Sequence, residues 1–161
     1  MRRQFGKTIV DLGILDSSLI LITGDVEQNM DDFKAMFPDR FFNFGLCEQS
    51  IVSLSGGLAL MGFKPVVYSI TPFILERAFE QIKIDIDENN LPVMLMGYDD
   101  YPHHGPTHRA LNAPEMVKLF KNIISFFPEN NKETKEAMEK AHSLKCPTFI
   151  KLKRDNINIV M

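Results

Sequence analysis

The sequence lacks the features of several large classes of protein. It contains only two cysteines, Cys47 and Cys146, and no tryptophan. Cysteines so far apart form neither a CxxC motif nor a disulfide framework, so we expect a reducing, cytoplasmic location. No apolar run approaches the length of a membrane span, and the N-terminal segment lacks the apolar core of a signal peptide. The net charge of -3 gives no electrostatic reason to bind nucleic acid or an acidic membrane.

Common motifs for nucleotide binding and hydrolysis are also missing. The sequence has no Walker-type glycine loop, no GxGxxG motif, no GxSxG elbow and no HExxH motif. Two histidines are adjacent, His103 and His104, but no constellation of cysteines or carboxylates supports a metal site around them. We therefore expect no metal site built by this chain alone.

What the sequence does contain is a regular alternation of two kinds of apolar segment. Short runs rich in branched and aromatic residues predict strands buried on both faces, and segments with apolar residues at helical spacing predict helices. The predicted strands are 18–25, 40–45, 64–70, 91–98, 122–127 and 146–153. The predicted helices are 3–16, 30–38, 48–63, 74–88, 113–121 and 128–144. This order predicts one three-layer α/β/α domain over residues 1–161, with a mostly parallel sheet of about six strands.

The predicted fold brings several polar side chains to one edge of the sheet. In parallel sheets, ligands bind outside the carboxyl ends of the strands. The loops after the first four predicted strands therefore share one rim, which would carry Asp25, Glu48, Phe73 and the loop 99–112.

Glu48 opens a segment that is otherwise apolar and has two interpretations. It can be an early helix residue that the helix dipole stabilises. It can also be a carboxylate held in a pocket with little water, where it exchanges a proton with a bound group. The two interpretations are compatible, and the local sequence does not choose between them.

Three stretches carry a resemblance to a known family. They are RFFNFGLCEQSIVSLSGGLALMGFKPVVYSI at 40–70, PFILERAFEQIKIDI at 72–86 and HGPTHRALNAPEM at 104–116. Together, in this order and spacing, they resemble the pyrimidine-binding domain of transketolases and of deoxyxylulose-phosphate synthase, which are thiamine-diphosphate enzymes. Each stretch alone would be a weak signal.

Four residues are expected to contact the cofactor, and the resemblance assigns the roles of two of them. By position, Glu48 matches the family glutamate that hydrogen-bonds a ring nitrogen of the aminopyrimidine and activates the cofactor. Phe73 matches the region where an aromatic ring stacks on the pyrimidine. Arg77 follows on the same predicted helix and can line the pocket or pair with a neighbouring carboxylate, and Asp25 is an expected contact because it lies on the same rim. Phe79 follows at helical spacing, so we expect it in the core.

Three histidines are expected to bind the substrate, and the resemblance assigns the role of one of them. His108 matches the histidine of the family's GPTH loop, which contacts the donor sugar near its reacting oxygens, where an imidazole can donate or accept a proton. His104 stands where transketolases usually have an aspartate that selects sugar stereochemistry. We expect catalytic roles for His108 and His104 and substrate contacts from both, together with His103. The exchange of a carboxylate for an imidazole indicates an unusual sugar.

One part of the family pattern is not found. Such enzymes bind the diphosphate through Mg²⁺ on another domain, with a GDG motif and a following asparagine, whereas residues 24–26 read GDV. The resemblance therefore implies a split enzyme, in which this chain lacks the diphosphate-binding and C-terminal domains. A separately encoded partner subunit would supply most of the Mg²⁺ ligands, and the two kinds of subunit would form an α2β2 complex. The expected reaction transfers a two-carbon ketol unit from a ketose or ketose-phosphate donor to an aldehyde acceptor.

Two other functions stay open. The chain could belong to a two-chain thiamine-diphosphate decarboxylase of a 2-oxo acid, or be a non-catalytic regulatory subunit with the same fold. The GPTH loop favours the sugar enzyme, and the presence of Glu48 and His108 argues against a loss of catalysis. A flavodoxin-like nucleotide-binding module would explain the alternation but not the three stretches.

Overall fold

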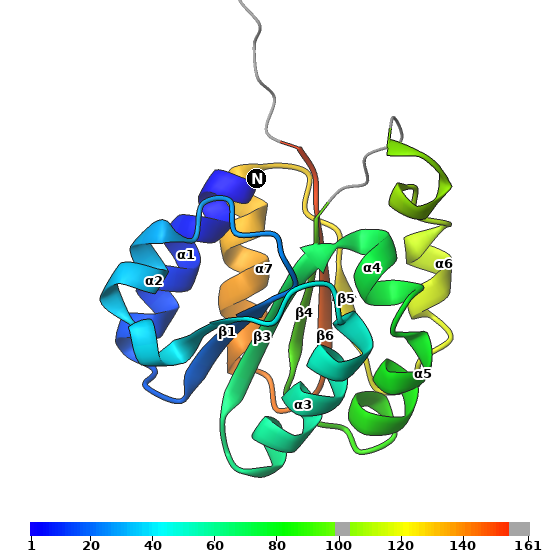
Figure 1. The fold of residues 1–161 in the computed structure, drawn as a ribbon, viewed down its shortest axis with the longest axis horizontal. Coiled ribbons are helices and arrows are strands. Elements are labelled where there is room, and N and C mark those ends of the chain that lie inside the picture. The colour runs from blue at the N-terminus through cyan, green and yellow to red at the C-terminus, as the bar shows by residue number, and fades with distance from the viewer. Residues whose placement is uncertain (99–103, 155–161) are drawn as a thin grey trace, which may run out of the picture.

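The centre of the molecule is a sheet of six parallel strands in the order β2-β1-β3-β4-β6-β5 (Figure 1). The computed structural model describes residues 1–98 and 104–154. The strands are β1 Leu19–Thr23, β2 Phe41–Asn43, β3 Lys64–Ile70, β4 Met94–Tyr98, β5 Ile124–Phe126 and β6 Thr148–Leu152. All six run in the same direction because a helical connection crosses over between consecutive strands.

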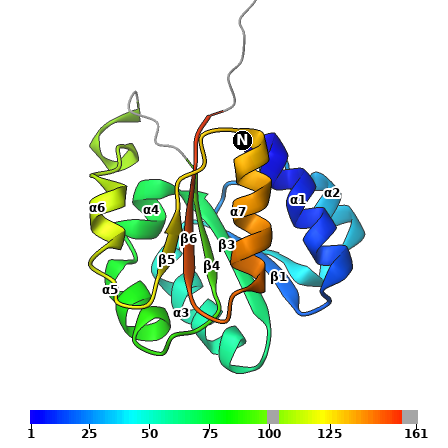
Figure 2. The same ribbon diagram turned by 180° about the vertical axis from the view of Figure 1, so that it is seen from behind.

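Helices cover both faces of the sheet and complete three layers (Figures 1 and 2). One face carries α1 Arg2–Leu15, α2 Asp31–Met36 and α7 Asn131–Ser143. The other face carries α3 Glu48–Leu60, α4 Thr71–Leu75, α5 Phe79–Gln81 and α6 Ala113–Val117. Three shorter elements are the 3₁₀ helices η1 Pro38–Arg40 and η4 Pro106–His108 and the π-helix η2 Ile82–Asp87. This architecture confirms the predicted α/β/α fold.

The alternation of side chains along each strand divides the core between the two faces. On β1, Leu19 and Leu21 join the cluster under α1 and α7, whereas Ile20 and Ile22 join the cluster under α3. Each such buried side chain stabilises the fold by roughly 1.5–3 kcal/mol. Because a one-residue shift would exchange the two sets, packing fixes the register and aligns the carboxyl ends of the strands.

The chain order of the sheet creates a position for a ligand. From β1 the sheet grows toward β2 on one side and toward β3 on the other. The connections that leave the carboxyl ends of β1 and β3 therefore diverge to opposite faces, and a crevice opens between them.

Within the described part of the chain, no helix has the length and apolarity needed to cross a membrane.

The prediction of one continuous helix over residues 74–88 is wrong. Helix α4 ends at Leu75, α5 begins at Phe79, and the π-helix η2 follows. At the interruption, Glu76 Oε1 accepts a hydrogen bond from the Leu111 N–H at 2.7 Å, and Arg77 extends toward the start of α3. The interruption turns two charged side chains toward the loops of the carboxyl edge.

Candidate functional site

A cavity of about 510 Å³ lies at the carboxyl edge of the sheet, at the divergence between β1 and β3. Four connections contribute to its wall. Its lining residues are Asp25, Val26 and Gln28 after β1, Leu46 after β2, Ile70, Phe73 and Arg77 at the end of β3 and beyond, and His104 and His108 after β4. The cavity volume lies in the range that holds small molecules and cofactors.

Glu48 is the first residue of α3, and its side chain is only 1% exposed. Its Oε2 accepts a hydrogen bond from Arg77 Nη1 at 3.1 Å. Its Oε1 is buried and has no hydrogen-bond partner within residues 1–98 and 104–154. Burying an unpaired carboxylate oxygen costs free energy, so this atom is a candidate acceptor for a ligand donor.

Two glycines bring the loops after β1 and β2 close to this carboxylate. A Cβ atom on Gly24 would lie 2.9 Å from the carbonyl oxygen of Gly45 and 3.6 Å from Glu48 Oε1. A side chain on Gly24 would therefore collide with the Gly45 backbone. Gly45 itself has φ +72°, a conformation that glycine adopts without strain.

An aromatic and histidine cluster forms part of the cavity wall. The Arg77 guanidinium carbon lies 3.5 Å from the centre of the Phe73 ring. The His108 ring meets Phe73 edge-on, with centroids 5.0 Å apart, and the His104 ring lies 5.4 Å from His108. The Thr107 hydroxyl lies 3.0 Å from His108 Nδ1 and orients that ring. These contacts hold two imidazoles in the cavity wall.

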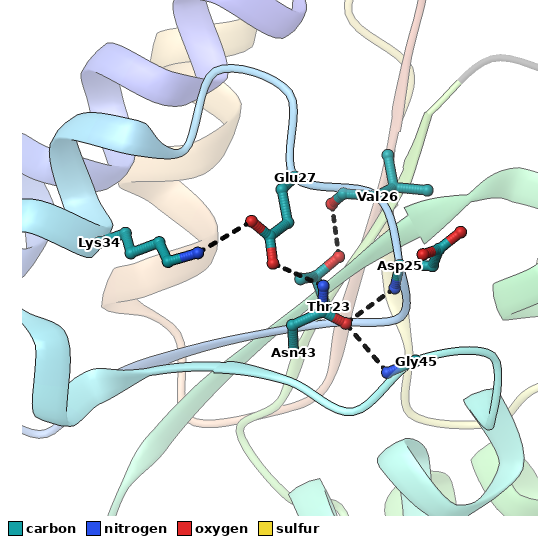
Figure 3. Close-up of polar contacts among 7 residues, drawn as sticks. All are labelled: Thr23, Asp25, Val26, Glu27, Lys34, Asn43 and Gly45. Carbon is teal, nitrogen blue, oxygen red and sulfur yellow. Dashed lines mark hydrogen bonds and ion pairs between the residues drawn. The ribbon is translucent and has the colours of Figure 1, made fainter.

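Asn43 also shapes the site, although no sequence motif singles it out. Its Oδ1 accepts hydrogen bonds from the backbone N–H groups of Asp25 and Gly45, at 3.0 and 2.9 Å. Its Nδ2 donates to Glu27 Oε1 at 2.5 Å. Figure 3 shows the amide between the two loops. One signal was available, since Asn43 is a lone polar residue among the phenylalanines of 41–44.

An exposed apolar surface adjoins the cavity. Phe42 and Phe44 stack with their centroids 5.9 Å apart, and Leu46 is 67% exposed while it also lines the cavity. Among the described residues, strand β2 lies at the edge of the sheet and has a neighbouring strand on one side only. We call Phe42, Phe44 and Leu46 the β2 apolar surface. Exposed apolar groups that gather in this way are typical of contact surfaces.

The structure thus places most of the predicted site residues around one cavity. Asp25, Phe73, Arg77, His104 and His108 line it, and Glu48 lies behind Arg77. His103 lies outside the described residues. Phe79 is half-buried and packs on Phe120 with centroids 4.8 Å apart, away from the cavity lining.

Two further observations concern ligand sites elsewhere. Among the described residues, no group of three or more His, Cys, Asp or Glu side chains could hold a metal ion. A second cavity of about 570 Å³ lies near the start of α1 and α7, and Lys153 and Glu129 on its wall form an ion pair. It contains none of the residues that the sequence singled out.

The sequence matches a known family over almost its full length. The family model described as "Transketolase, pyrimidine binding domain" matches residues 1–159. The 1-deoxy-D-xylulose-5-phosphate synthase of Neisseria meningitidis serogroup C (strain 053442) is 33% identical over 159 residues, which cover 93% of this chain and 24% of the relative. The synthase of Cupriavidus metallidurans is 31% identical with the same coverage. The chain thus spans about a quarter of the length of these curated relatives.

Solved structures share the fold. A structure entitled "Split gene transketolase, inactive beta4 tetramer" superposes with a TM-score of 0.88 and 28% identity, and the match covers 99% of this chain and 52% of the other. The transketolase from Leishmania mexicana superposes with a TM-score of 0.83, covering 96% of this chain and 25% of the other. At 19% identity, the second likeness concerns the fold alone.

Proposed function

The chain belongs to the family of transketolase pyrimidine-binding domains, and on this basis we propose that it is one subunit of a split, thiamine-diphosphate-dependent transketolase-like enzyme. It supplies the activating glutamate and the aminopyrimidine pocket. The enzyme transfers a two-carbon ketol unit from a ketose or ketose-phosphate donor to an aldehyde acceptor.

The observation that carries this proposal is the state of the Glu48 carboxylate. One oxygen is paired with Arg77, and the other is buried without a partner among the described residues. A ligand that brings an N–H or a shared proton to Oε1 would satisfy this atom in surroundings that contain little water, where such a hydrogen bond is strong. The protonated ring nitrogen of an aminopyrimidine fits this requirement.

The other cofactor contacts follow from the cavity lining. When bound, thiamine diphosphate supplies the electron sink for breaking a carbon–carbon bond beside a carbonyl group. Glu48 holds a proton at the pyrimidine ring nitrogen, Phe73 contacts the ring face, and Asp25 and Arg77 flank it. The diphosphate and most of the Mg²⁺ coordination belong to the partner subunit.

A pyrimidine ring that stacks on the face of Phe73 under the Arg77 guanidinium would displace that guanidinium. The Phe73 side chain is 6% exposed, and the Arg77 guanidinium lies over one face of its ring. Arg77 is more exposed and lines the cavity, so it has room to swing toward solvent. Arg77 therefore acts as a displaceable cover of the pyrimidine pocket.

The substrate side of the site consists of histidines. His108 and His104 face the cavity, where an imidazole can form hydrogen bonds to sugar oxygens as a donor or as an acceptor. His104 replaces an acceptor-only carboxylate of the family, so the pocket selects a hydroxyl pattern, or a phosphate, different from that of the common pentose phosphates. His103, from the same loop, is proposed as a further substrate contact.

The β2 apolar surface supports a partner subunit. Leu46 is exposed and lines the cavity, and Phe44, two residues before it, is also exposed, so a second protein bound here would exclude water from both the surface and the site. The likeness to a split-gene transketolase, described as an inactive β4 tetramer, also supports a multichain assembly. We propose an α2β2 complex with a separately encoded diphosphate-binding subunit.

A second candidate function rests on the curated relatives. Two of them, at 31–33% identity, are named 1-deoxy-D-xylulose-5-phosphate synthase. The same Glu48 and histidine arrangement would then serve the synthesis of a deoxy sugar phosphate. Product analysis separates the candidates, because only the ketol transfer needs a ketose donor.

Calorimetry on the reconstituted complex tests the proposed function. The chain is co-expressed with the reading frame beside its gene, and thiamine diphosphate binding with Mg²⁺ is measured for wild type, Glu48→Ala and Glu48→Gln. Gln49→Ala, at the exposed neighbouring position, is the matched control. We expect binding by the wild-type pair, and turnover of ketose donors that falls at least 100-fold in both Glu48 variants and stays normal in the control. Full turnover by Glu48→Gln, or no binding by the wild-type pair, would overturn the proposal.

A further inference from the structure

We propose that Asn43 is a positioning residue for Glu48. Its side-chain amide joins the loops after β1 and β2, and this junction holds the Glu48 carboxylate where a ligand can reach Oε1. We call Asn43, with Asp25, Gly45 and Glu27, the Asn43 clamp. The inference rests on the proposed role of Glu48, but the clamp itself can be measured without any cofactor.

The first step is the contact between the two loops. Asn43 ends β2, and its Oδ1 accepts one backbone N–H from each loop, at Asp25 and at Gly45 (Figure 3). Both donors have left-handed backbone conformations, with φ +69° at Asp25 and +72° at Gly45. A non-glycine residue such as Asp25 adopts this conformation at a cost in free energy. The hydrogen bond to Asn43 offsets part of that cost.

The second step connects the clamp to Glu48. The Gly45 carbonyl accepts a hydrogen bond from the Cys47 N–H at 2.9 Å, and Cys47 immediately precedes α3, whose first residue is Glu48. On the other loop, Gly24 precedes Asp25 and borders Glu48 Oε1. Asn43 therefore fixes both the backbone that carries Glu48 and the backbone that borders its free oxygen.

The third step is the orientation of the Asn43 amide. Asn43 Nδ2 donates to Glu27 Oε1, and Glu27 Oε2 accepts from Lys34 Nζ at 3.1 Å. The Asn43 hydrogen bond, followed by that of Lys34, lowers the pKa of Glu27 below its usual value. The ionised Glu27 accepts only, so it holds the Nδ2 side of the amide toward itself and the Oδ1 side toward the two N–H groups.

Exchanging the donor and acceptor roles of the side chains at positions 43 and 27 tests the clamp. Asn43→Ala removes both acceptor and donor. Asn43→Asp keeps an acceptor for the two N–H groups but places a second carboxylate against Glu27. Adding Glu27→Gln to Asn43→Asp restores a donor between the two side chains with the roles reversed. Asp87→Asn, in a buried position on η2 away from the cavity lining, is the control for a general loss of stability.

Three readouts are taken for each variant. Amide hydrogen exchange at Asp25 and Gly45 and the ¹³C resonance of the Glu48 carboxyl are measured on the chain alone. The dissociation constant of thiamine diphosphate with Mg²⁺ is measured on the chain–partner complex. We expect Asn43→Ala to raise the hydrogen-exchange rate of both amides at least tenfold and to shift the Glu48 carboxyl resonance. It should also weaken cofactor binding about tenfold. Asn43→Asp should show smaller changes of the same kind, and the double variant should return within twofold of wild type.

The outcomes separate the clamp from the proposed function. Unchanged amide exchange rates and an unchanged Glu48 resonance in Asn43→Ala would overturn the clamp. The same changes in Asp87→Asn would also overturn it, because they would reflect stability alone. A wild-type complex that binds no thiamine diphosphate would overturn the proposed function, and the clamp would then be decided by the amides and the Glu48 resonance.

Discussion

The Arg77 guanidinium contacts Glu48 and Phe73 at the same time. Its Nη1 lies 3.1 Å from Glu48 Oε2, and its Cζ lies 3.5 Å from the centre of the Phe73 ring. Glu48 is almost fully buried, whereas the Arg77 side chain is 38% exposed. One flexible cation thus neutralises the buried carboxylate and covers the aromatic face, so access to both depends on the position of this side chain.

Removing the Arg77 charge should destabilise the chain. Arg77→Met keeps an apolar side chain over Phe73 but leaves the buried Glu48 carboxylate without its cation. Because Arg77 is partly solvated, we expect a loss of about 2 kcal/mol in the free energy of unfolding, less than for a fully buried pair. Urea unfolding measures the change. Adding Glu48→Gln should recover most of it, because the neutral amide needs no cation; a double variant as unstable as Arg77→Met would contradict the assignment.

Phe73 and Phe79 should respond differently to the same substitution. Phe73 lines the cavity, whereas Phe79 packs on Phe120. Phe73→Leu should weaken thiamine diphosphate binding by the reconstituted complex about tenfold, since the stacking face is lost. Phe79→Leu is the matched control and should leave the dissociation constant within twofold while lowering stability. Equal effects on binding would show that Phe73 is ordinary core.

The β2 apolar surface should determine association with the partner. Phe44→Ser removes an exposed ring from this surface, and we expect it to weaken the complex at least tenfold in sedimentation velocity or calorimetry. Leu15→Ser is the control. Leu15 is also strongly exposed, but it ends α1 near the amino ends of the strands, away from the carboxyl ends where the cavity lies. If Leu15→Ser weakened partner binding as much as Phe44→Ser, the β2 apolar surface would not be the interface.

The layers and the sheet were predictable because the strands are apolar throughout. The predicted strand 64–70 has the same bounds as β3, since apolar side chains on both faces leave one arrangement that buries them. The interruption between Leu75 and Phe79 was not predictable from periodicity. Leu75 and Ile82 keep helical spacing and are buried on both sides of the break. The charged residues between them contact segments distant in sequence, and spacing carries no information about such contacts.

The candidate site was partly predictable for a similar reason. Strand order alone brings Asp25 and Phe73 to one rim, and the resemblance pointed to Glu48 and His108. The sequence did not indicate that Arg77 pairs with Glu48. Nor did it indicate the Asn43 clamp, because its hydrogen bonds depend on left-handed backbone at Asp25 and Gly45, which a sequence pattern does not reveal.

Acid should destabilise the chain through a cluster at the amino edge of the sheet. His142 Nε2 lies 3.1 Å from Asp16 Oδ2, and Lys64 pairs with the same carboxylate. Burial, and then the charge of Lys64, lower the pKa of His142 from its ordinary 6.5, although Asp16 opposes the change. Burial alone would raise the pKa of Asp16, but the hydrogen bonds from Ser18 and Lys64 outweigh it and hold that pKa far below its ordinary value.

Both shifts have the same sign for stability. Each group is deprotonated more readily in the folded chain, so its contribution is full above the unfolded pKa and is lost as the pH falls through the folded pKa. The free energy of unfolding should therefore fall between pH 7 and pH 5 because of His142, and fall further below about pH 4 because of Asp16. In urea titrations, His142→Gln should flatten the first fall and leave the second. A wild-type slope in His142→Gln between pH 7 and 5 would contradict this origin.

Asp87 should be a major determinant of stability outside the site. Its carboxylate is buried and accepts the backbone N–H groups of Lys121, Asn122 and Ile123 at 2.8, 2.8 and 3.1 Å. Asp87→Asn sets an amide donor against one of these N–H groups, and we expect a loss of about 2–3 kcal/mol in urea unfolding. Asp85→Asn is the control: Asp85 accepts from the exposed Ser53 hydroxyl, which can donate to an amide oxygen or accept from an amide N–H, so little should change. If Asp87→Asn were as stable as Asp85→Asn, the three hydrogen bonds would not hold the α6–β5 connection.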